Sequence, residues 1–118
     1  MINLFQRTAA PGLSPADAIA QHAKGDIVVV DVRDPMELKA SGTAKGSINI
    51  PLSTFQMRVD PRSPECHDDL KSGKPIAVFC ASGGRSSQAK QYLESVGYTD
   101  VHNIGGFGHW VQAGGPTE

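Results

Sequence analysis

The chain has 118 residues, of which 39% are hydrophobic and 19% are charged, and its formal net charge is −1. A chain of this length folds as a single domain around one core, and its nearly balanced charge excludes a general attraction to nucleic acid or to an anionic membrane surface. It contains no stretch of transmembrane length and no leader pattern at its start. We therefore expect one cytoplasmic domain without nucleic-acid or membrane partners, with a lead-in over residues 1–13, a core over residues 14–113 and a tail over residues 114–118.

Helical and extended patterns alternate along the first part of the chain. Within the lead-in, residues 2–5 favour a short edge strand. Ser14 followed by a proline is typical of a helix start, and Gly25 is typical of its end. Residues 27–30 form a continuous β-branched run, which is typical of a strand covered on both faces. This part of the chain therefore predicts a helix followed by a buried strand.

The same alternation continues in the middle of the chain. Asp34 followed by a proline is a second helix start, and Gly42 ends that helix. Residues 47–50 indicate a short strand closed by a proline, residues 52–59 a helical turn and residues 65–71 a short helix. The connections between these segments are too short to be domain linkers, which supports a single domain.

The stretch with the clearest chemical content begins at residue 76. Residues 76–80 read Ile-Ala-Val-Phe-Cys, a short apolar strand that ends in Cys80. The next seven residues, 81–87, read Ala-Ser-Gly-Gly-Arg-Ser-Ser, and residues 88–96 have a helical pattern. The sequence therefore predicts a strand, a tight loop and a helix, with a cysteine where the strand meets the loop.

The end of the chain adds a last strand and helix. Residues 101–104 indicate a strand, Gly105 and Gly106 a turn, and residues 107–113 a terminal helix. Strands that alternate with helices predict an α/β fold with right-handed βαβ units and a mostly parallel sheet. Ligands of such folds bind beyond the carboxyl ends of the strands, and Cys80 falls at such an end.

Cys80 lies in a setting that favours a thiolate. Successive N–H groups of a tight loop form a nest for negative charge, and the start of the following helix adds a positive dipole end. A cysteine in such a field has a lowered pKa. We expect Gly83 and Gly84 to allow close backbone approach and Arg85 to add a cation. A buried structural cysteine is the alternative, but the glycines, arginine and serines that follow favour a nucleophile.

The second cysteine has no such surroundings. Cys66 is adjacent to His67 in a polar, proline-bounded segment, and we interpret the two as a surface pair. The two cysteines of the chain, Cys66 and Cys80, are too far apart for a CxxC motif, and they belong to no four-ligand zinc pattern. We therefore expect no metal and no cofactor, and we expect Cys66 to be dispensable rather than a resolving thiol.

Four landmarks in this order resemble the single-domain rhodanese family over residues 14–113. They are Val30-Asp31-Val32-Arg33-Asp34 with Glu37, Gly46-Ser47-Ile48-Asn49-Ile50-Pro51, Cys80-Ala81-Ser82-Gly83-Gly84-Arg85-Ser86, and Gly105-Gly106 with Trp110. The resemblance implies a three-layer α/β/α domain with a central parallel sheet. It also implies transfer of a sulfane sulfur from a donor such as thiosulfate, through a cysteine persulfide, to cyanide or a thiol. Many members have His-Ile where this chain has Thr43-Ala44.

Carried over to this chain, the resemblance makes Cys80 the residue that becomes a persulfide. The outer sulfur and the donor's oxygens would be held by the backbone amides of the loop, those of Ala81, Ser82, Gly83, Gly84, Arg85 and Ser86. The implied partners are small anionic sulfur donors and thiol or cyanide acceptors, with a protein sulfur acceptor as a further possibility.

The roles of several side chains near the loop stay open. Arg85 either contacts the donor's oxygens, which we favour, or braces the loop by pairing with a carboxylate. Asp31 and Arg33 are expected to be structural, through hydrogen bonds or an ion pair, and Glu37 is a helix cap, a partner of Arg33 or both. The two serines after Arg85 are expected to be helix N-caps. Four side chains belong either to the rim of the pocket or to the core: Phe55, Met57, Phe107 and Trp110. Arg58 is a candidate for a second cation near the mouth of the pocket. Four histidines are expected to be bystanders: His22, His67, His102 and His109.

Two other functions compete with sulfur transfer. A cysteine-dependent phosphatase or arsenate reductase also places a thiolate in an anion-binding loop that ends in arginine. Those enzymes have five residues between the cysteine and the arginine, whereas four residues lie between Cys80 and Arg85. A shorter loop makes a tighter nest, suited to one sulfur rather than to a phosphate. The other competitor is a rhodanese-like module that carries sulfur or binds partners within an assembly.

Overall fold

The computed structural model describes residues 13–118. Four parallel strands form one sheet in the order β2-β1-β3-β4, with β1 at Val28–Asp31, β2 at Ile48–Asn49, β3 at Ile76–Cys80 and β4 at Val101–Gly106. The predicted parallel α/β architecture is confirmed. The edge strand expected at residues 2–5 lies outside the described residues.

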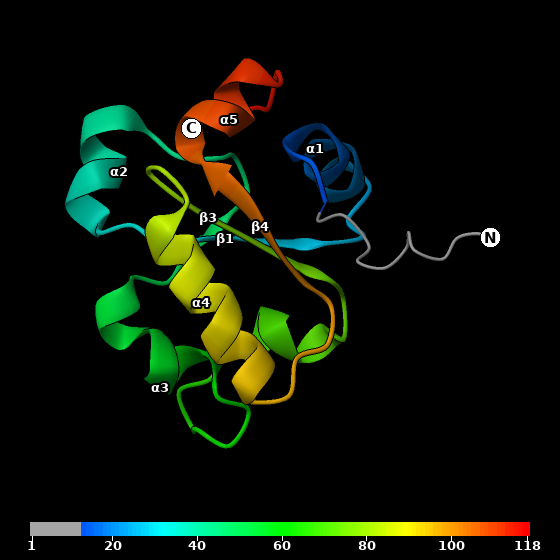
Figure 1. The fold of residues 1–118 in the computed structure, drawn as a ribbon, viewed down its shortest axis with the longest axis vertical. Helices are drawn as coiled ribbons and strands as arrows, with labels where there is room; N and C mark the ends of the chain where they lie inside the picture. Colours follow the sequence, from blue (N-terminus) through cyan, green and yellow to red (C-terminus); the bar gives the residue numbers. More distant parts are fainter. Residues whose placement is uncertain (1–12) are drawn as a thin grey trace.

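Five α-helices and two short 3₁₀ helices connect and cover the strands in the described part of the chain (Figure 1). The α-helices are α1 (Pro15–Ala23), α2 (Pro35–Ser41), α3 (Phe55–Val59), α4 (Gly84–Ser95) and α5 (Phe107–Gln112); the 3₁₀ helices are Leu52–Thr54 and Asp68–Ser72. None of the helices from residue 13 onward is long and apolar enough to cross a bilayer.

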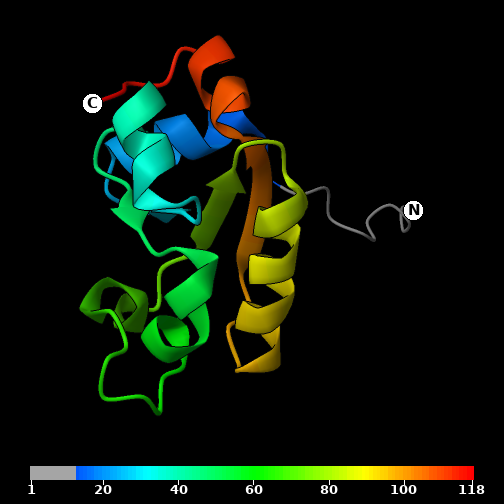
Figure 2. The same ribbon diagram turned by 90° about the vertical axis from the view of Figure 1, so that its left-hand side faces the viewer.

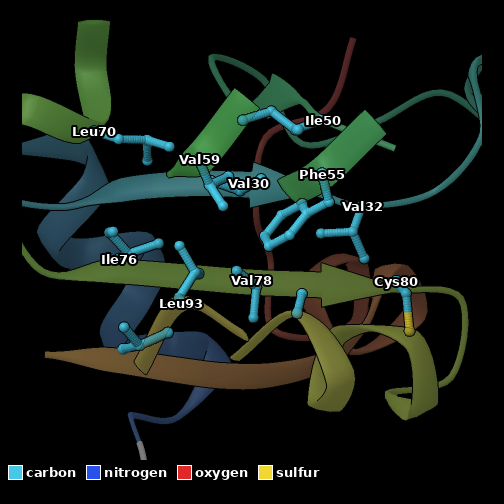
Figure 3. Close-up of a cluster of buried hydrophobic side chains, with 12 residues drawn as sticks. Val30, Val32, Ile50, Phe55, Val59, Leu70, Ile76, Val78, Cys80 and Leu93 are labelled. Atoms are coloured by element: carbon cyan, nitrogen blue, oxygen red, sulfur yellow. The ribbon is translucent and has the colours of Figure 1, made fainter. Parts of the chain in front are cut away.

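The sheet separates two apolar clusters, because successive strand residues point to opposite faces. On one face, Val30 and Val78 pack with side chains of α3 and α4 such as Phe55 and Leu93, and Cys80 belongs to this cluster (Figure 3). On the other face, strand residues pack with α1 and α5; this cluster comprises Ala18, Ile27, Val29, Ala44, Ala77, Phe79, Ile104 and Trp110. The three-layer α/β/α arrangement is therefore confirmed.

The helix starts that the sequence indicated are present. The Oγ of Ser14 accepts a hydrogen bond from the Asp17 amide at 3.1 Å, which caps α1. At the start of α2 the Asp34 amide donates to the Glu37 carboxylate at 3.0 Å. α1 ends next to Gly25, whose φ of 77° is in the left-handed region that glycine favours.

Three elements differ from the predictions. α4 begins at Gly84 rather than at residue 88, because its first turn lies at the polar site and carries no apolar pattern. β4 continues through Gly106, where a turn was expected, because Gly106 pairs with Cys80. The helix expected over residues 65–71 is a 3₁₀ helix over Asp68–Ser72.

The last residues pair with the segment that departs from the family pattern. The amide of Thr43 donates to the Glu118 carbonyl at 3.0 Å, and the Glu118 amide donates back at 2.9 Å. Ala44, beside them, is fully buried. The Thr43 hydroxyl donates to the Asp31 carboxylate at 2.7 Å. Thr43 and Ala44 thus tie the C-terminal tail to the end of β1.

Candidate active site

Cys80 lies at the carboxyl end of β3, where the chain turns into α4 beside the end of β4 (Figures 2 and 3). Two backbone amides donate to its sulfur, and one hydroxyl lies beside it. The Gly83 amide donates to Sγ at 2.9 Å and the Ser86 amide at 3.4 Å, and the Ser86 hydroxyl lies 3.4 Å from it. The nest of N–H groups predicted around Cys80 is present, and two of these groups donate directly to the sulfur.

The surroundings lower the pKa of the Cys80 thiol. Burial by itself raises this pKa, because a thiolate loses hydration inside the protein, but the hydroxyl and amide of Ser86 and the amides of Gly83 and Ser82 together lower the pKa by more. The depressed pKa that the sequence predicted is therefore confirmed in direction. The Ser86 hydroxyl contributes most to the lowering, although the sequence suggested only a capping role for it.

The glycines and serines of the Cys80 loop have only some of the roles that the sequence predicted for them. Gly83 has a φ of 106° and is the N-cap of α4, so the conformational freedom of glycine is required there. Gly84 does not require this conformational freedom, because its φ is not positive. A Cβ at this position would meet no atom within 4 Å. The expectation of close approach at Gly84 is therefore wrong. Ser86 and Ser87 are likewise not N-caps, because both lie inside the first turn of α4.

Close approach instead occurs at Gly106, which the sequence analysis took for a turn residue. A Cβ on Gly106 would lie 2.2 Å from the carbonyl oxygen of Ala81. The pairing of β3 with β4 shifts register between Val78, which pairs with Asn103, and Cys80, which pairs with Gly106. This bulge carries the end of β4 against the Cys80 loop, and nothing in the sequence apart from the two adjacent glycines indicates it.

Arg85 forms an ion pair that braces the Cys80 loop, which is one of the two roles that the sequence offered for it. Its Nη1 and Nη2 donate to the two carboxylate oxygens of Glu37 at 2.6 and 2.9 Å, which joins the loop to α2. Of the roles offered for Glu37, the helix cap is confirmed, whereas the ion pair is formed with Arg85 and not with Arg33. Contact of Arg85 with a donor's oxygens stays a prediction. These hydrogen bonds and the nearby positive charge lower the pKa of Glu37 to about 2.

The Arg85–Glu37 pair predicts a pH dependence of stability. A carboxyl whose pKa is lowered from 4.5 to about 2 stabilises the fold above pH 4.5, and this contribution is lost as the pH falls toward 2. We expect Glu37→Gln to be less stable than wild type at neutral pH, and the difference to shrink between pH 4.5 and 2. Urea unfolding across this range measures it, with Glu94→Gln as the control for loss of a surface ion pair. A difference that does not change with pH would contradict this role of Glu37.

Asp31 and Arg33 form a buried pair beside the site. The Arg33 Nε lies 3.0 and 3.1 Å from the two carboxylate oxygens of Asp31, and its Nη2 donates to one of them at 2.7 Å. The guanidinium of Arg33 also lies 4.6 Å from the ring centroid of Phe107, the first residue of α5. The Asp31–Arg33 ion pair is one of the two structural roles that the sequence offered for these residues. Through the contact of Arg33 with Phe107, it joins the end of β1 to the segment after Gly106.

Several other expectations need correction. Cys66 is not on the surface: it is buried, with its sulfur 3.7 Å from the Val59 carbonyl and 3.9 Å from the Tyr98 hydroxyl. For Phe55 and Trp110 the core position, one of the two alternatives, is the one found. The ring nitrogen Nδ1 of His109 accepts a hydrogen bond from the Gly106 amide at 2.9 Å, so this histidine supports the backbone next to the Cys80 loop.

Access to the sulfur is closed in this structure. Cys80 has 0% of its surface exposed. Two hollows of about 250 Å³ lie on the amino-terminal side of β1 and β3, at the opposite end of the strands, and neither is lined by a residue of the Cys80 loop. We give these hollows no role in the chemistry. A reagent that reaches Cys80 therefore needs a local movement of the loop.

Comparison with known proteins agrees with this geometry. The family model of the rhodanese-like domain matches residues 14–113. The thiosulfate sulfurtransferase PspE of Escherichia coli K12 is 38% identical over 77 residues, which are 65% of this chain and 67% of PspE. The tRNA uridine(34) hydroxylase of Rickettsia canadensis is 36% identical over 83 residues, 70% of this chain, but the match spans only 32% of that longer protein.

Solved structures show the same fold. The human single-domain sulfurtransferase TSTD1 superposes with a TM-score of 0.70 at 31% identity, covering 88% of this chain and 97% of that one. RPA3614 from Rhodopseudomonas palustris, described as a protein of unknown function and possible tyrosine phosphatase, gives a TM-score of 0.81 at 36% identity and covers 95% and 87% of the two chains. With its cysteine-centred loop between β3 and α4, the chain belongs to the rhodanese-like domain family.

Proposed function

We propose that this protein is a sulfurtransferase that carries a sulfane sulfur on Cys80. The observation that supports the proposal is a buried thiol with a lowered pKa, held by the amides of Gly83 and Ser86. The relatives named as sulfurtransferases match most of this chain and are themselves matched over most of their length. The donors are thiosulfate or a small persulfide, and the acceptors are cyanide or a thiol, on a small molecule or on a protein.

The first half of the reaction loads the cysteine. The Cys80 thiolate attacks the sulfane sulfur of thiosulfate, a new S–S bond forms, and the S–S bond of thiosulfate breaks with release of sulfite. The electron pair of the broken bond leaves with sulfite. The charge balances, because a thiolate monoanion and a thiosulfate dianion become a persulfide monoanion and a sulfite dianion. No general base is needed, because the surroundings of Cys80 already favour the thiolate.

The second half of the reaction returns the free cysteine. The persulfide anion loses its outer sulfur to cyanide, which gives thiocyanate, or to a thiolate, which gives a new persulfide. In the closed loop the amides stabilise the anion without further reorientation, because the fold holds them in place. The first N–H groups of a helix have no acceptor within the helix, so those of Gly84 and Arg85 are available to the outer sulfur and the donor's oxygens.

The closed loop adds a step before chemistry. Since Cys80 has no exposed surface, the loop from Ala81 to Gly83 must move before a donor reaches the sulfur. Ala81 and Ser82 are exposed, which allows this segment to shift without disturbing the core. The proposed cycle is therefore opening of the loop, attack on the donor, and closing around the persulfide.

Phosphatase activity is the competing function, and the description of RPA3614 names it as a possibility for that protein. The geometry at Cys80 favours sulfur. Two amides converge on Sγ at 2.9 and 3.4 Å, so the donors of the nest are spaced for single sulfur atoms. A tetrahedral phosphate needs a wider ring of donors.

Intact mass spectrometry after incubation with thiosulfate tests the proposal. We expect wild type to gain one sulfur atom, cyanide to remove it, and Cys80→Ala to gain none. Cys66→Ala is the matched control, because it removes the other buried thiol and should still be loaded. An adduct that persists in Cys80→Ala would overturn the assignment, as would hydrolysis of an aryl phosphate by a wild type that takes up no sulfur.

A further inference from the structure

The two residues whose hydrogen bonds hold the sulfur are both tied to one side chain on β4, that of Asn103. The amide nitrogen Nδ2 of Asn103 donates to the carbonyl of Gly83 at 3.0 Å. Its oxygen Oδ1 accepts from the Ser86 hydroxyl at 2.8 Å. One asparagine thus contacts the residue on each side of the nest, although the structure shows no hydrogen bond from it to the sulfur itself.

We infer that Asn103 is a positioning residue, which holds the donors of Gly83 and Ser86 on Cys80. This inference rests on the proposed sulfur transfer for its catalytic meaning, but the geometry stands without it. An asparagine suits the task because its side chain has a donor end and an acceptor end. The donor end is used on a carbonyl and the acceptor end on a hydroxyl, so no charge is introduced beside a thiolate.

The bulge in β4 explains how Asn103 reaches the loop. Asn103 pairs with Val78, two residues before Cys80, whereas Cys80 pairs with Gly106. The Oδ1 atom of Asn103 also accepts from the Gly105 amide at 2.9 Å, which fixes the side chain across the irregular segment. A bulge next to an active site commonly redirects a side chain in this way. Here it directs the asparagine toward the start of α4.

Loss of this support has a defined effect on the thiol. Gly83 has a positive φ and lies between an exposed serine and the first turn of α4, so its carbonyl needs an anchor to keep its amide on the sulfur. The Ser86 hydroxyl has one proton and three neighbouring acceptors: Asn103 at 2.8 Å, the Gly105 carbonyl at 3.4 Å and the Cys80 sulfur at 3.4 Å. Asn103 keeps the hydroxyl oxygen beside the sulfur.

Two variants separate the parts of this role. Asn103→Leu removes all three hydrogen bonds while keeping a side chain of similar size. Asn103→Asp keeps an acceptor for Ser86 and Gly105, but it cannot donate to the Gly83 carbonyl and it places a negative charge near the thiolate. Asn49→Leu is the matched control, because Asn49 is also a half-buried strand asparagine, and it donates to the carbonyls of Asp31 and Arg33 rather than to the Cys80 loop.

The experiment measures the rate of Cys80 alkylation against pH and, separately, the rate of sulfur loading from thiosulfate. All proteins carry Cys66→Ala, so that alkylation reports Cys80 alone. Both Asn103 variants should raise the pKa of the Cys80 thiol, because the Gly83 amide is no longer held on the sulfur. Asp should raise this pKa more than Leu, because Asp adds a negative charge whereas Leu frees the Ser86 hydroxyl to donate to the sulfur. Both variants should slow loading by about tenfold, the effect of losing one hydrogen bond to a charged group. Asn49→Leu should change neither quantity.

The alkylation profile does not depend on sulfur transfer, so the two proposals fail separately. If wild type takes up no sulfur but the Asn103 variants still shift the profile, the proposed function is wrong and the positioning role stands. If both Asn103 variants match Asn49→Leu in profile and in loading rate, the positioning role is wrong. Should Asn103→Leu not fold, the smaller Asn103→Ala takes its place, because it also removes all three hydrogen bonds without adding a charge, and an unshifted profile in that variant overturns the inference.

Discussion

Gly106→Ala is expected to slow persulfide formation on Cys80 by on the order of a hundredfold, the effect of displacing a reacting group by about 1 Å. The new Cβ would lie 2.2 Å from the Ala81 carbonyl oxygen and 2.8 Å from its carbon. Both are backbone atoms, so either β4 or the loop after Cys80 has to move. The φ of Gly106 is −112°, which any residue can adopt, so the effect comes from the contact and not from backbone strain.

The control for this substitution is two residues away. Gly108→Ala adds the same methyl group in α5 at a position where a Cβ meets no atom within 4 Å. It should keep the rate of wild type and slightly increase stability, because alanine is the better helix former. Loading rates and unfolding curves of both variants are compared. A Gly106→Ala protein that folds and loads sulfur as fast as Gly108→Ala would show that the loop tolerates the shift.

Arg33→Met is expected to lower the free energy of unfolding by about 3–5 kcal/mol, the usual cost of leaving one partner of a buried ion pair without the other. The side chain of Arg33 is 4% exposed and that of Asp31 is 0% exposed, so water cannot replace the lost guanidinium. The substitution also removes the hydrogen bonds that Arg33 donates to the Ser41 hydroxyl and to the Gly42 carbonyl, at 2.9 and 2.8 Å. Urea unfolding at neutral pH measures the loss.

A second aspartate–arginine pair with the same spacing lies on the surface and serves as the control. Asp60 and Arg62 have the same spacing as Asp31 and Arg33, and the Arg62 amide, Nε and Nη2 bond the Asp60 carboxylate at 2.9, 3.1 and 3.0 Å. The side chain of Arg62 is 85% exposed. Arg62→Met should therefore leave the free energy of unfolding nearly unchanged, because surface ion pairs contribute little. An equal decrease in the free energy of unfolding in the two variants would mean that burial is not the reason why the Asp31–Arg33 pair stabilises the fold.

The sequence by itself determined the elements whose signals are local. The β-branched run before Asp31 and the apolar run before Cys80 became neighbouring parallel strands, and Ser14 caps its helix as predicted. These features depend on residues close together in the chain, such as a serine and the amide three residues after it. The cysteine and its glycine-containing loop were recognisable for the same reason, since the nest is built from consecutive residues.

The tertiary structure alone decided which residues complete the site. Whether Arg85 contacts Glu37, 48 positions away, or Asn103 contacts Gly83, 20 positions away, depends on strand register and on a bulge in β4 that no local pattern specifies. Gly106 illustrates the limit: the sequence suggested a turn, but this glycine is required because another part of the backbone passes within contact distance. Local order is set by neighbours in the chain, whereas the site is set by which distant segments the packed sheet brings together.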